Sequence, residues 1–375
     1  MPSHFRPILA ISVFSVAVAV LPGFEPPAEA EEAVPPVSVD PAAKPLRNLS
    51  EYHLFKGTGY DQIPNDGVVP FDVTSPLFSD YATKHRFIWM PLGTSAEYRA
   101  DDVFSFPVGT VIIKSFGFLD DMRDPSKGER IIETRLMIHQ VDGWVGLPYV
   151  WKDDESDAVL KVAGTTVDVQ WIHTDGQVRK NNYIVPNLNQ CKSCHENNKV
   201  MLPIGPKARN LNRDYPYAHG TENQLAYWAQ VGYLKGAPAS PEAAILPVWN
   251  DPATGTVTQR ARAWLEINCM HCHNPAGGAN TTALDLSYAQ TDARKVGFMK
   301  PPVAAGRGSG GRLYDIVPGK PDESILVYRL ESVDPGVMMP ELPRRLVDDE
   351  GTALIRDWIA SMDPAAPIDE LAKAE

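Results

Sequence analysis

Between residues 46 and 180 the chain alternates between apolar and polar positions in short stretches, as strands that bury one face do. Val167 and Val169, for example, are separated and followed by polar residues. The dipeptides Asp142-Gly143 and Asp175-Gly176 are typical of hairpin turns. This part of the sequence therefore predicts a β-rich domain.

Beyond residue 180 the apolar positions recur three and four residues apart, which is the period of an α-helix. We predict amphipathic helices over about 222–234, from about 258 to Cys269, and over 354–362. Thr221 to Gln224 has the form of a capping box for the first helix, and the acidic residues 348–350 suit the dipole at the start of the last.

Together these patterns predict an α+β multidomain protein, with an N-terminal β-rich domain followed by a mainly α-helical region. The expected divisions are a signal peptide at 1–30, a linker at 31–45, the β-rich domain at 46–180, a first cofactor-binding region at 181–250, a second cofactor-binding domain at 251–363 and a tail at 364–375.

The N-terminus has the features of an export signal. Arg6 is followed by an apolar run over residues 8–21 and by Ala28-Glu29-Ala30, which has the form of a signal-peptidase site. The run is short for a bilayer span, so we expect no transmembrane anchor after cleavage and a periplasmic location. The net charge of −12 argues against nucleic acid as a partner.

All four cysteines belong to two C-x-x-C-H motifs, at residues 191–195 and 269–273. Two thiols three residues apart lie about one helical turn from each other, so both can form thioether bonds to one porphyrin. The adjoining histidine then coordinates the iron. We therefore predict two covalent haem c groups, bound through Cys191 and Cys194 with His195 on the first iron, and through Cys269 and Cys272 with His273 on the second.

Paired cysteines also occur in other kinds of site. Zinc knuckles need no histidine directly after each pair, and the two pairs are 78 residues apart, farther than in zinc ribbons. A redox C-x-x-C would account for one copy at most. A disulfide across two residues closes too small a loop to stabilise much. None of these alternatives explains a histidine after both pairs, so we favour haem.

Residues 251–363 resemble a class I cytochrome c domain: a helix, the motif, a long Gly/Pro-rich stretch, a Met-Pro pair and a terminal amphipathic helix. The resemblance implies that His273 is the proximal ligand and that a late methionine is the sixth. We prefer Met339, which precedes a proline, over Met338 or the more remote Met299. We interpret His271, between the two cysteines, as an exposed surface residue.

The sixth ligand of the first iron stays open from the sequence. Pro186 argues against a helix leading into this motif. His219, Met201, a residue of the β-rich domain and an open position are the alternatives. A six-coordinate iron transfers electrons, whereas an open one admits small ligands. Lys207 and Arg209 are either partners of haem propionates or ordinary solvated charges.

Four segments resemble an uncharacterised bacterial family of exported dihaem c-type cytochromes that has no assigned substrate. They are Pro-Leu-Phe-Ser-Asp-Tyr-Ala at 76–82, Phe-Pro-Val-Gly-Thr-Val at 106–111, the motif at 191–195, and Pro-Ile-Gly-Pro-Lys-Ala-Arg-Asn-Leu-Asn at 203–212. The resemblance extends over nearly the whole mature chain. It implies two covalent haems in an exported protein.

The sequence favours an electron carrier that works between redox protein partners through its two haems. A dihaem enzyme is the alternative, either a peroxidase or a small-molecule dehydrogenase, with the first haem catalytic and the second supplying electrons. A haem-bearing binding module that uses the β-rich domain to hold a ligand is a third hypothesis.

Overall fold

The structure is a computed structural model that describes residues 34–239, 242–303, 305–342 and 344–373. Residues 35–375 form one unit, separate from the residues before them. The signal peptide expected at 1–30 lies outside the described residues. No helix in the described ranges is long and apolar enough to cross a membrane.

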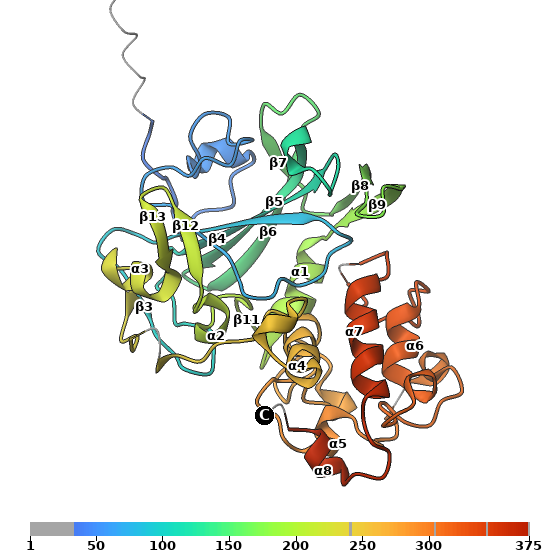
Figure 1. Ribbon diagram of the computed structural model, residues 1–375. Helices are drawn as coiled ribbons and strands as arrows, with labels where there is room; N and C mark the ends of the chain where they lie inside the picture. Colours follow the sequence, from blue (N-terminus) through green and yellow to red (C-terminus); the bar gives the residue numbers. More distant parts are fainter. Residues whose placement is uncertain (1–33, 240–241, 304, 343, 374–375) are drawn as a thin grey trace, which may run out of the picture. The chain divides into compact units, whose positions relative to one another are not determined.

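The N-terminal part is built on a six-stranded antiparallel sheet with the strand order β1-β2-β4-β5-β6-β7 (Figure 1). Its strands are β1 (Val69–Phe71), β2 (Thr83–Trp89), β4 (Val111–Leu119), β5 (Glu129–Gln140), β6 (Gly143–Trp151) and β7 (Ala158–Leu160). The predicted β-rich N-terminal part is therefore confirmed. The turn expected at Asp142-Gly143 lies one residue earlier: Val141 and Asp142 form it, and Gly143, with φ of 118°, a value that favours glycine, begins β6 opposite Gln140.

The alternating residues near 167 form a separate antiparallel hairpin of β8 (Thr165–Ile172) and β9 (Val178–Val185). Gly176, in the turn between them, has φ of 80°.

The segment before the sheet is bonded to the start of the β region: the backbone N–H of Ser38 donates to the carbonyl of Tyr52 at 3.0 Å. The segment predicted as a linker is thus attached to the β region from about residue 35 on.

The two faces of the main sheet are covered differently. One face carries a single apolar core that includes Phe87, Ile113 and Tyr149. The opposite face carries two apolar clusters, one around Ile112 and the other around Phe116. Ile112 and Phe116 lie on the same strand with Lys114 between them, so this face changes from apolar to charged and back to apolar along β4.

The chain between the sheet and the C-terminal helices consists of short elements. They are α1 (Leu188–His195), β10 (Glu196–Asn197), β11 (Val200–Met201), α2 (Ala208–Leu211), β12 (Asp214–Tyr217), β13 (Gly220–Asn223), α3 (Gln224–Gln230) and β14 (Leu234–Lys235), the last pairing in parallel with β3 (Ala96–Glu97).

Two predictions for this stretch are wrong in detail. The helix expected over 222–234 is only α3, because Asn223 is its N-cap and accepts hydrogen bonds from the N–H groups of Leu225 and Ala226. Thr221 instead belongs to strand β13. Despite Pro186, a helix does carry the first motif, because the proline lies just before the N-cap of α1, where it does no harm.

The C-terminal part is more helical, as predicted (Figure 1). Its helices are α4 (Val257–Asn268), α5 (Ala293–Val296), α6 (Ile325–Glu331), α7 (Asp349–Ala360) and α8 (Ile368–Leu371). Thr256 caps α4 and Asp348 caps α7, which confirms the predicted helices before Cys269 and near the C-terminus. Trp264 of α4 donates its indole N–H to the Asp348 carboxylate at 3.0 Å, which ties the two helices together.

Candidate functional site

The first motif, residues 191–195, lies on α1 against the sheet. A capping box fixes the start of the helix: Asn187 accepts from the N–H of Gln190, and Gln190 accepts from the N–H of Asn187, both at 2.9 Å. Gly146 of β6 makes room for the motif, because a Cβ there would lie 3.1 Å from Cys191 Cβ and 2.8 Å from Met201 Cε. The absent side chain is what lets a cysteine approach the sheet.

His195 has one ring nitrogen in a hydrogen bond, and the other has no hydrogen-bond partner in the part of the chain that the structure describes. Its Nδ1 lies 2.8 Å from the carbonyl oxygen of Leu202, and the N–H of Leu202 donates to the His195 carbonyl at the same distance. A carbonyl can only accept, so Nδ1 must carry the proton and Nε2 keeps its lone pair. Burial lowers the pKa of His195 to about 4, so the ring is neutral near pH 7. A neutral imidazole with a free Nε2 is the form that binds a metal.

The second motif, residues 269–273, directly follows α4. Cys269 is buried in the helical core, and its N–H donates to the Leu265 carbonyl at 2.9 Å. Burial raises the pKa of this thiol to about 12. The second motif therefore begins inside a packed helical core.

His273 reaches the same protonation pattern as His195 through a side chain. Its Nδ1 lies 3.1 Å from Thr282 Oγ1, and that hydroxyl donates to the Ala279 carbonyl at 2.8 Å. Because the hydroxyl proton is used on Ala279, the oxygen must accept from Nδ1, which leaves Nε2 of His273 free. Burial lowers the pKa of His273 to about 4 as well. Both motif histidines thus present a neutral ring with Nε2 available.

The two motifs contact each other. Interactions with the side chains of Cys272 and His271 lower the pKa of the Cys194 thiol. Asn198, three residues after the first motif, donates its N–H to the carbonyl of Ala276 at 2.8 Å. Segments that are 78 residues apart in the sequence are therefore side by side.

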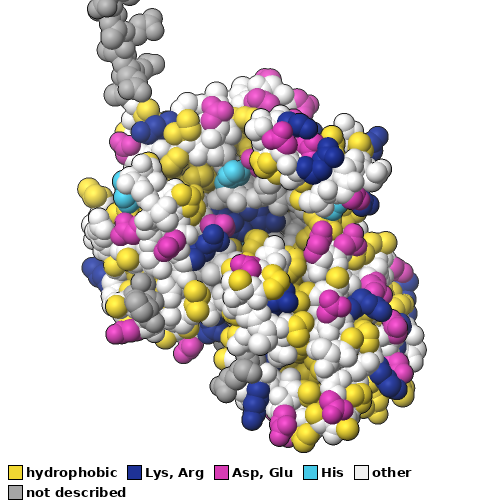
Figure 2. All heavy atoms as spheres, in the orientation of Figure 1, with side chains coloured by type: hydrophobic (Ala, Val, Ile, Leu, Met, Phe, Trp, Pro, Cys, Tyr) yellow, Lys and Arg dark blue, Asp and Glu magenta, His cyan; other side chains and the backbone are white. Residues whose placement is uncertain are grey.

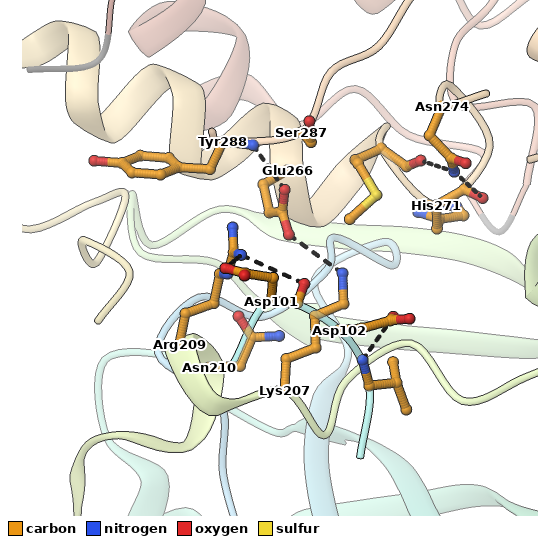
Figure 3. Close-up of polar contacts among 12 residues, drawn as sticks. Asp101, Asp102, Lys207, Arg209, Asn210, Glu266, His271, Asn274, Ser287 and Tyr288 are labelled. Atoms are coloured by element: carbon orange, nitrogen blue, oxygen red, sulfur yellow. Dashed lines mark hydrogen bonds and ion pairs between the residues drawn. The ribbon is translucent and has the colours of Figure 1, made fainter. Parts of the chain in front are cut away.

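The prediction that His271 is exposed is wrong. Only 9% of the residue is accessible, because it is enclosed where the two motifs meet, and its Nδ1 has no hydrogen-bond partner among the described residues. Asn274 donates to the carbonyls of Met270 and His271 at 2.8 and 3.4 Å, which holds the motif backbone in a turn (Figure 3).

The candidate methionines of the second site lie in two loops. Met339 is half-buried and Met338 is buried. The buried guanidinium of Arg344 donates to the Met339 carbonyl at 2.8 and 3.1 Å, and the N–H of Met339 donates to the Arg329 carbonyl at 3.0 Å. Arg344 also acts electrostatically on Cys269, so the Met339 loop is fixed in the neighbourhood of the second motif. Met299 is in another loop, with its N–H bonded to the Ile316 carbonyl.

The candidates for the first iron are placed very differently. His219 stacks on Tyr217 and Tyr227 at an exposed hairpin, where its Nε2 lies 3.2 Å from Glu222. It does not line the cavity beside the first motif. Met201 does line it, and so does Met137 of β5 in the β-rich domain.

The cavity beside the first motif lies between the sheet and the C-terminal part. Its empty space is about 1320 Å³ when the part open to solvent is counted. Cys191, Cys194 and His195 line one side, apolar side chains such as Ile112 and Leu147 line the sheet side, and Ile267 of α4 closes it from the helical part. Figure 2 shows a hollow near the middle of this face of the molecule, with Lys and Arg side chains inside it.

Lys207 and Arg209 are not ordinary solvated charges, since both are over nine-tenths buried. The Lys207 ammonium lies 3.3 Å from Glu266 of α4, and Glu266 also accepts the N–H of Tyr288 at 2.8 Å (Figure 3). Arg209 reaches Asp101 at 3.4 Å. These pairs connect the region after the first motif to α4 and to a loop of the β region.

Comparisons with protein-family models, with curated proteins and with solved structures gave no match. Within the described ranges, no three His, Cys, Asp or Glu side chains are grouped so as to hold a bare metal ion. Sequence reasoning missed Gly146, Leu202 and Thr282. Gly146 contributes a missing side chain, Leu202 a backbone carbonyl and Thr282 a single hydroxyl, and none of these leaves a distinctive sequence pattern. It also missed the charged positions on the sheet face, because they come together only in the register of β2, β4 and β5.

Proposed function

We propose that this protein is an exported, periplasmic dihaem c-type cytochrome that transfers single electrons between redox protein partners. The observation that carries the proposal is common to both motifs. Each combines two thiols with a buried, neutral histidine whose Nδ1 is used in a hydrogen bond, so that Nε2 is free for iron. A structural C-x-x-C pair would need no such preparation of the histidine that follows it.

The residues present fit two covalent haems. Cys191 and Cys194 would hold the first next to a cavity, and Cys269 and Cys272 would hold the second. His195 and His273 would be the proximal ligands, and Met339 the sixth ligand of the second. When bound, each haem supplies an iron that cycles between its ferric and ferrous states. The chain contributes the attachment, the orientation of the imidazoles and the exclusion of water.

The arrangement of the C-terminal part supports the proposed class I cytochrome c domain. Helix α4, the second motif, the loop with Met339 and helix α7 follow in the order typical of that class, and α4 and α7 pack together through Trp264 and Asp348. The resemblance to exported dihaem cytochromes is consistent with this domain. An export signal would also deliver the chain to the side of the membrane where haem c is attached.

The contact between the two motifs is what favours a relay. The side chains of Cys194 and Cys272 interact, and the N–H of Asn198 donates to the Ala276 carbonyl at 2.8 Å, so groups attached to the two motifs would lie close to each other. Close, fixed attachment points favour rapid electron exchange within the protein. A protein with two independent cofactor functions would have no need for this contact.

The test is the cofactor content of the mature protein, measured by mass and by the pyridine haemochrome spectrum. We expect two haems per chain, no signal peptide, and low-spin spectra in both redox states. A colourless product, or a mass that shows fewer than two haems, would contradict the proposal.

The cavity favours one second candidate, a dihaem redox enzyme in which the first haem is catalytic. Its space beside His195 could admit a small ligand, and His219 lies elsewhere. EPR and visible spectra with carbon monoxide or peroxide distinguish the candidates. A high-spin iron that binds carbon monoxide would favour the enzyme, whereas two low-spin irons inert to both ligands would favour the electron carrier.

A further inference from the structure

Three cations stand side by side on the sheet face that carries the cavity. Arg86 of β2 pairs in register with Lys114 of β4, and Lys114 pairs with Arg135 of β5. All three line the cavity beside the first motif. We call Arg86, Lys114 and Arg135 the cation row. Like charges directly opposite on neighbouring strands repel, so the row is costly unless negative charge balances it.

The ends of the row have carboxylate partners. Arg86 is paired with Asp72, which also lies 3.3 Å from Arg213. Arg135 is paired with Glu133, a fully buried carboxylate that also accepts the Tyr183 hydroxyl at 2.7 Å. The outer two positions of the row are therefore compensated within the protein.

Among the described residues, the middle of the row has no carboxylate bonded to it, and the negative charge that acts on it, that of Glu133, is already paired with Arg135. Within the described ranges, the Lys114 ammonium has no hydrogen bond and no ion pair, and it lies over the ring of Phe116, 4.8 Å from the centroid. The guanidinium of Arg135 lies over the same ring at 4.2 Å. Burial, and then the charge of Arg86, hold the pKa of Lys114 well below its usual value. Lys84, two residues before Arg86 on the same face, donates to the Ala82 carbonyl at 2.8 Å and has no carboxylate partner among the described residues.

Nothing in the packing of β4 requires a lysine at residue 114. The positions before and after it on the same face of β4, Ile112 and Phe116, are apolar and buried. A methionine at residue 114 would continue that face at lower cost, since an unpaired cation between apolar neighbours on its own strand and cations on the adjacent strands is destabilising. The neighbouring cavity is the space into which a compensating anion would fit.

We propose that the cation row is an anion site centred on Lys114, and that its ligand is a carboxylate-class group held in the cavity next to the first motif. Two sources share this chemistry: a propionate of the haem attached to Cys191 and Cys194, or a free small carboxylate or oxyanion that binds beside it. The first source rests on the proposed function, whereas the second does not. Either way, Lys114 contacts the anion, while Arg86 and Arg135, which keep their own carboxylates, provide a positive surrounding.

The test compares Lys114→Met with Lys161→Met in the full mature chain as purified. Met keeps the length of the side chain and removes its charge, and Lys161 is an exposed lysine in a turn. Lys114→Arg is the rescue variant. Three quantities are measured at constant ionic strength: the thermal midpoint, the midpoint potential of each haem, and binding of acetate, succinate and phosphate by calorimetry.

If the ligand is a propionate, Lys114→Met lowers the thermal midpoint by about 2–4 °C and lowers the potential of one haem, with no binding of added anions. If the ligand is free, one of the three probes binds the wild type and binds Lys114→Met at least about tenfold more weakly. In both cases Lys114→Arg stays close to the wild type, and Lys161→Met is unchanged.

The proposal is overturned if Lys114→Met is as stable as the wild type or more stable, leaves both potentials unchanged, and no probe binds the wild type. This result is distinguishable from failure of the proposed function. A colourless protein would contradict the cytochrome, but binding of a probe anion to it through Lys114 would still confirm the anion site.

Discussion

The two C-x-x-C-H motifs share their cysteines and histidine but have different surroundings. The first is on a short helix that rests on the face of a β-sheet, beside a cavity with cations in its wall. The second starts in the core of a helical region, at the end of α4. The orienting bond of its histidine goes to a side chain, Thr282, whereas that of His195 goes to the backbone of Leu202.

This difference suggests a division of labour between the proposed haems. A site enclosed in a helical core, with a methionine loop fixed by Arg344, suits a six-coordinate electron-transfer iron. A site beside a cavity can exchange ligands or bind an anion. The interaction of Cys194 with Cys272 and the hydrogen bond from Asn198 to Ala276 then link the two environments.

Removal of the attachment cysteines should have the largest effect. Cys191→Ala with Cys194→Ala, and Cys269→Ala with Cys272→Ala, should each leave one haem per chain. The second pair should also lower the thermal midpoint more, because Cys269 belongs to the helical core whereas Cys191 lies outside the three apolar clusters of the sheet. Haemochrome spectra and circular dichroism measure both effects. Equal losses of stability would contradict the contrast between the sites.

Gly146→Val should act on the first site alone. The added side chain would collide with Cys191 and Met201, so we expect a loss of about 1–3 kcal/mol in the free energy of unfolding and less haem at the first motif. Gly205→Ala is a control in the same cavity wall, because the nearest atom to its new Cβ would be 3.9 Å away. Urea unfolding and haem content check the outcome, and full occupancy of both motifs in Gly146→Val would be the contrary result.

The sequence predicted what depends on local pattern. Helix α4 and helix α7 follow from apolar spacing and from their caps, Thr256 and Asp348. The strands of the β region follow from alternation. A helix of eight residues such as α1 has too few apolar positions to give a periodic signal, so Pro186 was given too much weight.

What the sequence could not predict depends on contacts between distant segments. The burial of His271 results from the meeting of two motifs that are far apart in the chain. The cation row exists only once the register of β2, β4 and β5 is known. Neither the order of strands in the sheet nor the contact of the motifs can be read from residue types alone.

Met339→Ala should change the second haem without removing it. Loss of the thioether ligand should lower the potential of that haem and abolish the weak Met-to-iron absorption at the red end of the visible spectrum, because a thioether favours ferrous iron. Potentiometric titration followed by absorbance measures both. Met338→Ala and Met299→Ala are the matched controls. If either control loses the absorption and Met339→Ala keeps it, the ligand is assigned to the wrong methionine.

Thr282→Val should have the smallest effect of these changes, and it tests the contrast between the two histidines. Valine has the shape of threonine but cannot accept the Nδ1–H of His273, so the imidazole loses its orienting partner. We expect a small change in the potential of the second haem and a shift in its His–iron stretching frequency, with both haems still attached. Thr282→Ser, which keeps the hydroxyl, should restore both values.

The first site offers no equivalent side-chain substitution, because the acceptor for His195 is the Leu202 carbonyl. Leu202→Ala keeps that carbonyl and should leave the His–iron frequency of the first haem unchanged, although it removes apolar contacts. Resonance Raman spectra of the two variants therefore compare a side-chain acceptor with a backbone acceptor. The contrary result would be an altered His–iron frequency of the first haem in Leu202→Ala with an unchanged frequency of the second haem in Thr282→Val. The orientation of His273 would then not depend on Thr282.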